Sequence, residues 1–173
     1  MPRRNLELKF RVQELSAARR AYDGIATPAA VIEQVDTYFH AARERLKLRE
    51  SVVGPGIREV TLIAYDRPDV ADVRASDYQL VAVPEAAGIK SALAAALGVR
   101  GVVRKRREVL LHHNVRIHLD AVEGLGTFVE FEAVISPDDG EAVSLKRLDA
   151  LCGLLGLARK DAIAGSYADL LGL

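Results

Sequence analysis

Charged side chains recur at every second position in five segments of the chain. Segment 5–12, for example, alternates polar and apolar residues, as does 45–49, a pattern typical of strands with two unlike faces. The polar faces carry the cations Lys9, Arg11, Arg45, Lys47, Arg49, Lys105, Arg107 and Arg116 and the carboxylates Glu7, Asp120, Glu130 and Glu132. Cations neutralise phosphoryl oxygens, and carboxylates position Mg²⁺ or Mn²⁺ against them. The pattern therefore indicates a polyphosphate site that uses a divalent metal.

A plainer interpretation is a sheet whose polar face is simply solvated, as in many amphipathic sheets. On that interpretation the protein has an unrelated partner, and the charges serve no site. If such a sheet closes into a barrel, Arg11, Lys47 and His118 fit an exposed position at its mouth at least as well as a functional one. Like charges on neighbouring strands repel unless a ligand or water separates them, which favours the binding site.

About eight strands would position these side chains. Besides the alternating segments, weaker strand patterns cover 29–39, 57–66 and 76–83, and turn residues such as Gly54 to Gly56 separate the strands. Short connections between many strands are typical of an antiparallel sheet, and closure into a barrel would remove its edges. We therefore expect a mainly β fold of the α+β class, an eight-stranded antiparallel closed barrel with a charged lumen and a few flanking helices.

The flanking helices are predicted from apolar residues at helical spacing. One covers 84–97 and ends at Gly98, and another runs from a cap at Asp138 or Asp139 to Leu155. Its apolar stripe comprises Leu145, Leu148, Leu151, Cys152 and Leu155. A short helix over 14–23 and a final helical turn that begins at Ser166 complete the set.

Length and composition exclude several classes of protein. The chain has 173 residues, with 24 basic and 24 acidic side chains, which predicts one domain over 1–173 and argues against nucleic-acid or anionic-membrane binding. The single Cys152 excludes a disulfide framework and a zinc site of four cysteines. No secretory signal or membrane-length apolar run is present, so we expect a cytoplasmic protein.

The same segments, in order, resemble the CYTH domains, or triphosphate tunnel metalloenzymes, a superfamily that includes class IV adenylate cyclases and thiamine triphosphatases. The motifs that carry the resemblance are Asn5-Leu-Glu7-Leu-Lys9, Asp36-Thr-Tyr-Phe39, Arg45-Leu-Lys-Leu-Arg49, Val103-Arg-Lys105-Arg-Arg107, the stretch from His118 to Glu132, and Ser166-Tyr-Ala-Asp-Leu-Leu171. They span residues 4–171 and are most similar to the cyclase branch. The fold that the family implies is an eight-stranded barrel around a charged tunnel.

The resemblance also implies residue roles. Metal ligands would be Glu7, Glu130 and Glu132, with Asp120 supporting the metal or the reacting phosphate, and the metal would be Mg²⁺ or Mn²⁺. Catalytic roles are expected for Lys9, Asp120 and Glu130. The triphosphate would contact Lys9, Arg45, Lys47, Arg49, Lys105, Arg107 and Arg116.

Two departures from the family pattern put the substrate in doubt more than the fold. Asn5 stands where the opening motif has its first glutamate, which removes a charged ligand. Asp66 stands where a lysine is usual, and Arg67 would point to the other face of a regular strand. The strand over 76–80 also lacks a glutamate that the family often has.

The family contains two reactions, and the sequence does not separate them. The first hypothesis is conversion of ATP to cyclic AMP and pyrophosphate. The second is a triphosphatase for inorganic tripolyphosphate, thiamine triphosphate or a nucleoside triphosphate. A third is a module that binds polyphosphate or a nucleotide without turnover, which Asn5 and the missing lysine favour. The apolar carboxyl-terminal segment would pack on its own barrel or on a second subunit in a homodimer.

Overall fold

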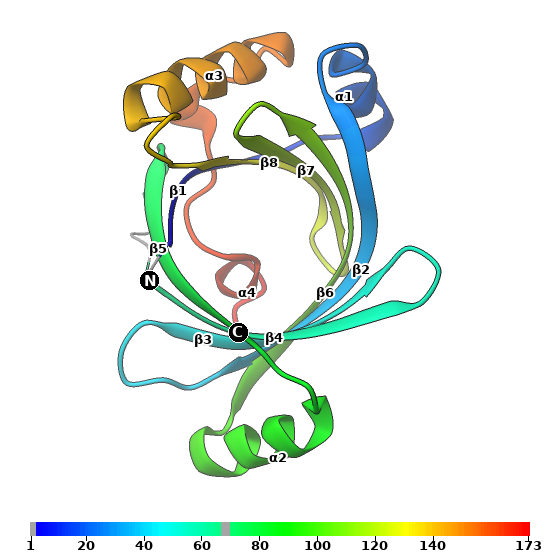
Figure 1. The fold of residues 1–173 in the computed structure, drawn as a ribbon, viewed down its shortest axis with the longest axis vertical. Helices are drawn as coiled ribbons and strands as arrows, with labels where there is room; N and C mark the ends of the chain where they lie inside the picture. The colour runs from blue at the N-terminus through cyan, green and yellow to red at the C-terminus, as the bar shows by residue number, and fades with distance from the viewer. Residues whose placement is uncertain (1–2, 67–69) are drawn as a thin grey trace.

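Eight strands of the described chain close into an antiparallel barrel, as the sequence predicts (Figure 1). The computed structural model describes residues 3–66 and 70–173, and Arg67 lies outside these ranges. The strands are β1 (Arg3–Arg11), β2 (Thr27–Phe39), β3 (Arg45–Val53), β4 (Ile57–Asp66), β5 (Arg74–Ala82), β6 (Val99–His112), β7 (Val115–Val122) and β8 (Gly126–Val134). Around the barrel they follow the order β1, β5, β4, β3, β2, β6, β7, β8, and β8 pairs again with β1.

The alternation in the sequence sets which side chains face outward. On β1, Leu6, Leu8 and Phe10 are buried on the outer side of the barrel, while Glu7 and Lys9 line the lumen. Successive side chains of a strand point to opposite faces, and the same division holds on β7 and β8. On β6, Lys105 and Arg107 line the lumen, but the outward face carries the exposed Arg104 and Arg106. The largest apolar cluster therefore lies outside the sheet, while a second one, which includes Tyr38, Tyr65 and Tyr167, lies within the ring of strands beside the charged lining.

Helices cover this outer apolar face. The helices α1 (Leu15–Ala21) and α3 (Glu141–Leu154) lie beside the part of the barrel formed by β1, β7 and β8 (Figure 1). Leu148 and Leu151 of α3 and Tyr22 after α1 are buried there among the outward side chains of the sheet. The helix α2 (Ala86–Leu97) closes a smaller cluster with Phe39 and Leu48.

The predicted cap of α3 is wrong by one or two residues. The N-cap is Gly140, which has no side chain to offer the free N–H groups, and neither Asp138 nor Asp139 caps the helix. Asp139 instead accepts a hydrogen bond from Arg147, and its backbone N–H donates to Ser136. The aspartate is therefore used in the turn before the helix. The predicted apolar stripe is confirmed, with Leu148, Leu151 and Cys152 buried.

The carboxyl-terminal segment enters one end of the barrel. After a 3-10 turn, η1 (Arg159–Asp161), the chain reaches α4 (Tyr167–Leu170), which lies inside the ring of strands in Figure 1. Tyr167 and Ala168 are buried with Tyr38, Val103 and Phe128. Of the two arrangements expected for this segment, the structure has the one in which it packs on its own barrel. We call this the plugged end.

No helix in the described part of the chain is long and apolar enough to cross a membrane.

Candidate functional site

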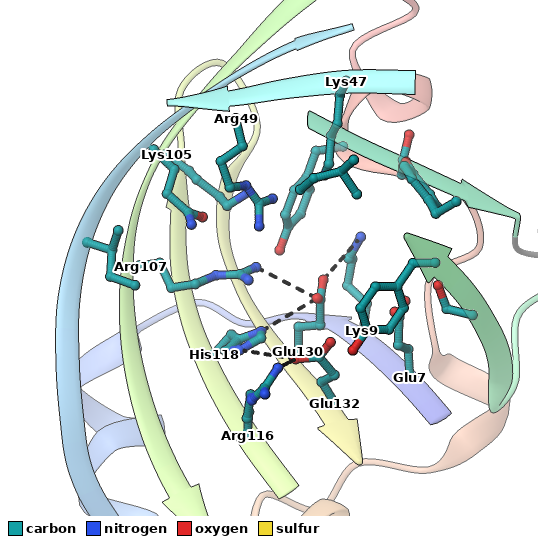
Figure 2. Close-up of a pocket in the computed structure, with 18 of the residues that line it drawn as sticks. Glu7, Lys9, Lys47, Arg49, Lys105, Arg107, Arg116, His118, Glu130 and Glu132 are labelled. Carbon is teal, nitrogen blue, oxygen red and sulfur yellow. Dashed lines mark hydrogen bonds and ion pairs between the residues drawn. The ribbon is translucent and has the colours of Figure 1, made fainter. Parts of the chain in front are cut away.

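The lumen contains a cavity of about 420 Å³. Side chains from every strand of the barrel and from α4 line it, and Figure 2 shows the charged ones pointing inward. Its lining comprises Glu7, Lys9, Ala30, Ile32, Gln34, Tyr38, Lys47, Arg49, Ile63, Tyr65, Ser76, Tyr78, Leu80, Lys105, Arg107, Val109, Arg116, His118, Glu130, Glu132, Ser166 and Tyr167. The volume is that of a typical small-molecule site.

One buried carboxylate holds three of the cations. Asp36 on β2 accepts two hydrogen bonds of 2.7 Å from Arg49, and Lys47 Nζ lies 3.0 Å from its Oδ2. Lys105 Nζ on β6 lies 3.4 Å from the same oxygen. Burial opposes ionisation, but the surrounding cations hold the pKa of Asp36 well below its usual range. Asp36 therefore fixes one wall of the cavity as a cationic surface.

The two lysines on this wall ionise near neutral pH. Burial, with the positive charge of Arg49 nearby, lowers the pKa of Lys47 to about 7. Burial lowers the pKa of Lys105 to about 8, although Asp36 favours its charged form. Crowded, desolvated cations gain most from an incoming anion, so this wall is suited to phosphoryl oxygens.

A second buried carboxylate supports Arg107 from behind. Asp120 on β7 accepts hydrogen bonds of 2.7 and 2.6 Å from Arg107, and the Tyr167 hydroxyl donates to it at 2.8 Å. Asp120 is fully buried and is absent from the cavity lining. Despite burial, Arg107 and its neighbours lower the pKa of Asp120. In this arrangement Asp120 positions the guanidinium of Arg107, and its oxygens are occupied.

The remaining carboxylates lie between cations on β8. Glu130 lies 3.4 Å from Lys9, 3.7 Å from Arg107 and 3.6 Å from His118 (Figure 2). Burial would raise the pKa of Glu130, but the charges of Lys9 and Arg107 and the contact with His118 lower it well below its usual range. Glu132 accepts hydrogen bonds from Asn5 and, at 3.1 Å, from Arg116. Both carboxylates are therefore already paired with cations of the cavity.

The donor set fits a divalent metal. Glu7 is the register partner of Glu132, and Lys9 is that of Glu130, so three carboxylates from two paired strands share one wall of the lumen. Hard oxygen donors of this kind suit Mg²⁺ or Mn²⁺. Among the residues that the structure describes, no three acidic, histidine or cysteine side chains already converge as a formed metal site. In the structure Lys9 and Arg107 lie beside Glu130, and the Asn5 amide and Arg116 donate to Glu132.

The structure brings most of the predicted site residues together. Those that line the cavity are Glu7, Lys9, Lys47, Arg49, Lys105, Arg107, Arg116, Glu130 and Glu132. Asp120 lies behind Arg107, and Arg45 lies beyond the lining, where it contacts Asp169 at 3.3 Å. Their roles in binding and catalysis stay predictions.

Arg11, Lys47 and His118, which the sequence left as either exposed or functional, differ in their positions. Lys47 and His118 line the cavity, and His118 is only 5% exposed. Arg11 is exposed, with its guanidinium over the ring of Phe128 and a hydrogen bond to the carbonyl of Leu125. Asp66, where the family usually has lysine, is also exposed and does not line the cavity.

Several residues of the site were not singled out from the sequence. Asp36 appears in the sequence analysis only within a motif, although Gln34, Asp36 and Tyr38 stand at alternate positions and therefore share one face of the strand. Tyr38, Tyr65 and Tyr78 line the cavity, but an isolated tyrosine in a strand carries no distinctive signal. Tyr167 reaches the site only because α4 enters the barrel, which no local pattern predicts.

The chain is similar to a known protein family and to several known proteins. The model of the CYTH domain family matches residues 3–167. A protein of Methanocaldococcus jannaschii, named as a putative adenylate cyclase, is 32% identical over 71 residues, a match that covers 41% of this chain and 41% of that protein. The PH1012 protein from Pyrococcus horikoshii has a similar structure, with a TM-score of 0.77, 25% identity and coverage of 96% of this chain and 98% of its own.

A further structural neighbour is the Hippeastrum protein HpAC1, a putative adenylyl cyclase described as having a dominant triphosphatase activity. Its TM-score is 0.61 with 16% identity, and the match covers 97% of this chain and 95% of that chain. At this identity the similarity concerns the fold.

Proposed function

Because the chain belongs to the CYTH domain family, we propose that it is a metal-dependent enzyme that converts ATP to cyclic AMP and pyrophosphate in the barrel cavity. One observation supports the binding of a triphosphate. A single cavity is lined by five cations from β1, β3 and β6, namely Lys9, Lys47, Arg49, Lys105 and Arg107. Such a concentration of cations matches a chain of phosphoryl groups. The partial similarity to a Methanocaldococcus jannaschii protein named as a putative adenylate cyclase supports the cyclase reaction.

The chemistry of the cavity changes along its axis. Lys9 and Lys105 lie over the ring of Tyr167 at the plugged end, with their ammonium groups 3.9 and 5.5 Å from the ring centre. Ala30, Ile32, Val109 and Leu80 form an apolar part of the lining, and Leu80 is 49% exposed. This gradient suits an organic triphosphate that enters with its phosphates first.

Glu7 and Glu132 lie nearer than Lys9 to the open end of the barrel, which is the end opposite α4. In the β1–β8 register, Phe128 belongs to the plugged end, the Lys9–Glu130 pair follows, and the Glu7–Glu132 pair lies further out. For a nucleotide bound with its terminal phosphate deepest, this order brings the outer carboxylates toward the α-phosphate. That is the phosphorus at which a cyclase reacts.

In the proposed mechanism, Arg49, Lys105 and Arg107 neutralise the charge that develops on the leaving pyrophosphate. Glu7, Glu130 and Glu132 would hold the divalent metal. When bound, the metal would supply Lewis-acid polarisation of the α-phosphoryl group. Binding of the triphosphate gives Lys9 and Arg107 new anionic partners, which frees oxygens of Glu130 for that role.

A second candidate is hydrolysis of the terminal phosphate. It is favoured by the plugged end itself, where Lys9 and Lys105 flank Tyr167, because the deepest phosphoryl group would be the best neutralised. In that case water is the nucleophile, and an inorganic tripolyphosphate or a thiamine or nucleoside triphosphate is the substrate.

The products distinguish these reactions. Purified protein would be incubated with ATP or with tripolyphosphate, each with Mg²⁺ or Mn²⁺, and every product resolved by chromatography. Cyclic AMP with pyrophosphate supports the cyclase. Phosphate without cyclic AMP supports the triphosphatase instead. Binding of both anions without turnover would overturn both and leave a binding module.

A further inference from the structure

His118 is placed differently from the other histidines of the chain. All four lie within the described residues, and His40, His112 and His113 are at or near the surface. His118 projects from β7 into the cavity (Figure 2) and is 5% exposed. It is the register partner of Glu130 on β8.

Both ring nitrogens face carboxylates at distances too long for hydrogen bonds. His118 Nδ1 lies 3.6 Å from Glu130 Oε1, and Nε2 lies 3.8 Å from Glu132 Oε2. The buried Nδ1 atom has no hydrogen-bond partner among the described residues. A buried polar atom is normally paired, so an orphaned imidazole nitrogen that faces a carboxylate is arranged to take a further partner between them.

The chemistry of the surroundings favours a cation as that partner. Glu130 and Glu132 offer carboxylate oxygens on one side of the ring, and a neutral imidazole offers a nitrogen lone pair. Imidazole with carboxylates is a common donor set for first-row metal ions. Asn5 stands beside this group and donates its amide hydrogen to Glu132, so it supplies no charge to a cation there.

We propose that His118, through Nδ1, is a nitrogen ligand of the divalent cation held by Glu130. The inference rests on the proposed function, which places a metal among these carboxylates. The Nε2 atom faces Glu132, as the second nitrogen of a metal-bound histidine commonly faces a carboxylate. A mixed nitrogen and oxygen donor set favours Mn²⁺ over Mg²⁺, because Mg²⁺ prefers oxygen ligands alone.

The test is Mn²⁺ binding observed by electron paramagnetic resonance. The full chain, labelled with ¹⁵N-histidine, would be titrated with Mn²⁺, alone and with a triphosphate analogue whose bridging oxygens are methylene groups. We expect a ¹⁵N coupling to bound Mn²⁺ in pulsed spectra. His118→Leu should abolish that coupling and weaken Mn²⁺ binding about tenfold or more. His118→Gln provides a second variant if the leucine variant does not fold.

The control variant is His40→Gln, which changes an exposed histidine and should leave both the coupling and the affinity unchanged. Mn²⁺ binding without a histidine coupling, and with equal affinity in the His118 variants, would overturn the inference while the proposed metal site stands. If the wild-type protein binds no Mn²⁺ with or without the analogue, the metal dependence of the proposed function fails together with this inference. Glu130→Gln separates the cases further, because it should reduce Mn²⁺ binding whether or not His118 is a ligand.

Discussion

Asp36 and Asp120 each hold cations at a fixed place in the lumen. Asp36 pairs with Arg49, Lys47 and Lys105, and Asp120 pairs with Arg107. Preorganised charges cost no rearrangement when the substrate develops charge in its transition state. At the scale of single residues, the site therefore consists of positioned cations and of carboxylates that can exchange partners.

Glu130 is the carboxylate on which the reaction should depend most. Glu130→Gln keeps the shape of the side chain but removes the charge that faces Lys9 and Arg107. We expect turnover to fall by about 100-fold or more, with a much smaller effect on thermal unfolding. Product formation and circular dichroism would be measured beside Glu123→Gln, an exposed control. Full activity in Glu130→Gln would contradict the assignment.

Anion binding should weaken as pH rises from 6 to 9. Over this interval Lys47, with a pKa of about 7, and Lys105, with a pKa of about 8, lose their charge. Sulfate is a suitable ligand because its own charge is constant, and its affinity would be followed by thermal shift. Lys47→Met should flatten the profile, and an unchanged profile in that variant would exclude Lys47 as the titrating group.

The stability of the free protein should change in the opposite direction. An unfolded lysine keeps its usual pKa of 10.5, so above pH 7 the unfolded chain binds more protons at Lys47 than the folded chain does. These lysines therefore contribute a rise in the free energy of unfolding with pH. Urea titrations of wild type and Lys47→Met at pH 6 and pH 9 would isolate that contribution.

At the scale of elements, α4 is the one helix of the described chain that contributes to the cavity wall. Ser166 caps it by accepting a hydrogen bond from the backbone N–H of Asp169, whose carboxylate accepts in return from the Ser166 backbone. Asp169 also pairs with Arg45 and Arg100. These ion pairs fix the short helix to β3 and β6. They thereby place the Tyr167 hydroxyl within hydrogen-bond distance of Asp120.

Removal of the Tyr167 hydroxyl tests this link. Tyr167→Phe keeps the ring contact with Phe128, whose centroid lies 5.0 Å away, but deletes the hydrogen bond to Asp120. We expect a loss of about 1–3 kcal/mol in the free energy of unfolding, because a buried carboxylate loses a donor. Urea unfolding measures it. A variant as stable as wild type would show that Tyr167 does not support Asp120.

At the scale of the whole molecule, the barrel encloses more charge than an ordinary core. Its largest apolar cluster lies outside, against α1 and α3, and its lumen holds opposed charges that an anion and a metal would reorganise. Ligand binding should therefore stabilise the entire fold, since every strand contributes to the cavity lining.

Tripolyphosphate at 100 times its Kd should raise the free energy of unfolding by about 2.7 kcal/mol. For a chain of this length that corresponds to a Tm increase of about 5–10 °C, measurable by differential scanning fluorimetry. The double variant Lys47→Met, Lys105→Met leaves Asp36 paired with Arg49 and should lose most of the shift. No shift at millimolar tripolyphosphate, with or without Mg²⁺, would contradict the triphosphate site.

The sequence by itself determined the strands, the inward face of five of them and the family. Alternation on β1, β3, β6, β7 and β8 predicted which charges point together, because the two-residue period follows from the geometry of a strand. It also predicted closure, since an open antiparallel sheet leaves two edges to remove. A simple meander, in which each strand pairs with the next, was wrong, because β1 pairs with β5 and β8, and β2 pairs with β6. The cap of α3 was missed because an aspartate near a helix start can bond elsewhere in its turn.

Only the tertiary structure decided which side chains meet across the lumen. Asp36 and Lys105 are 69 residues apart in sequence, and Asn5 and Glu132 are 127 apart. Their contacts depend on strand register and barrel closure, which are set by the sum of many pairings and by outer packing. For the same reason the depth of Asp120, the burial of His118 and the entry of α4 have no local signal, because each depends on what the rest of the barrel encloses.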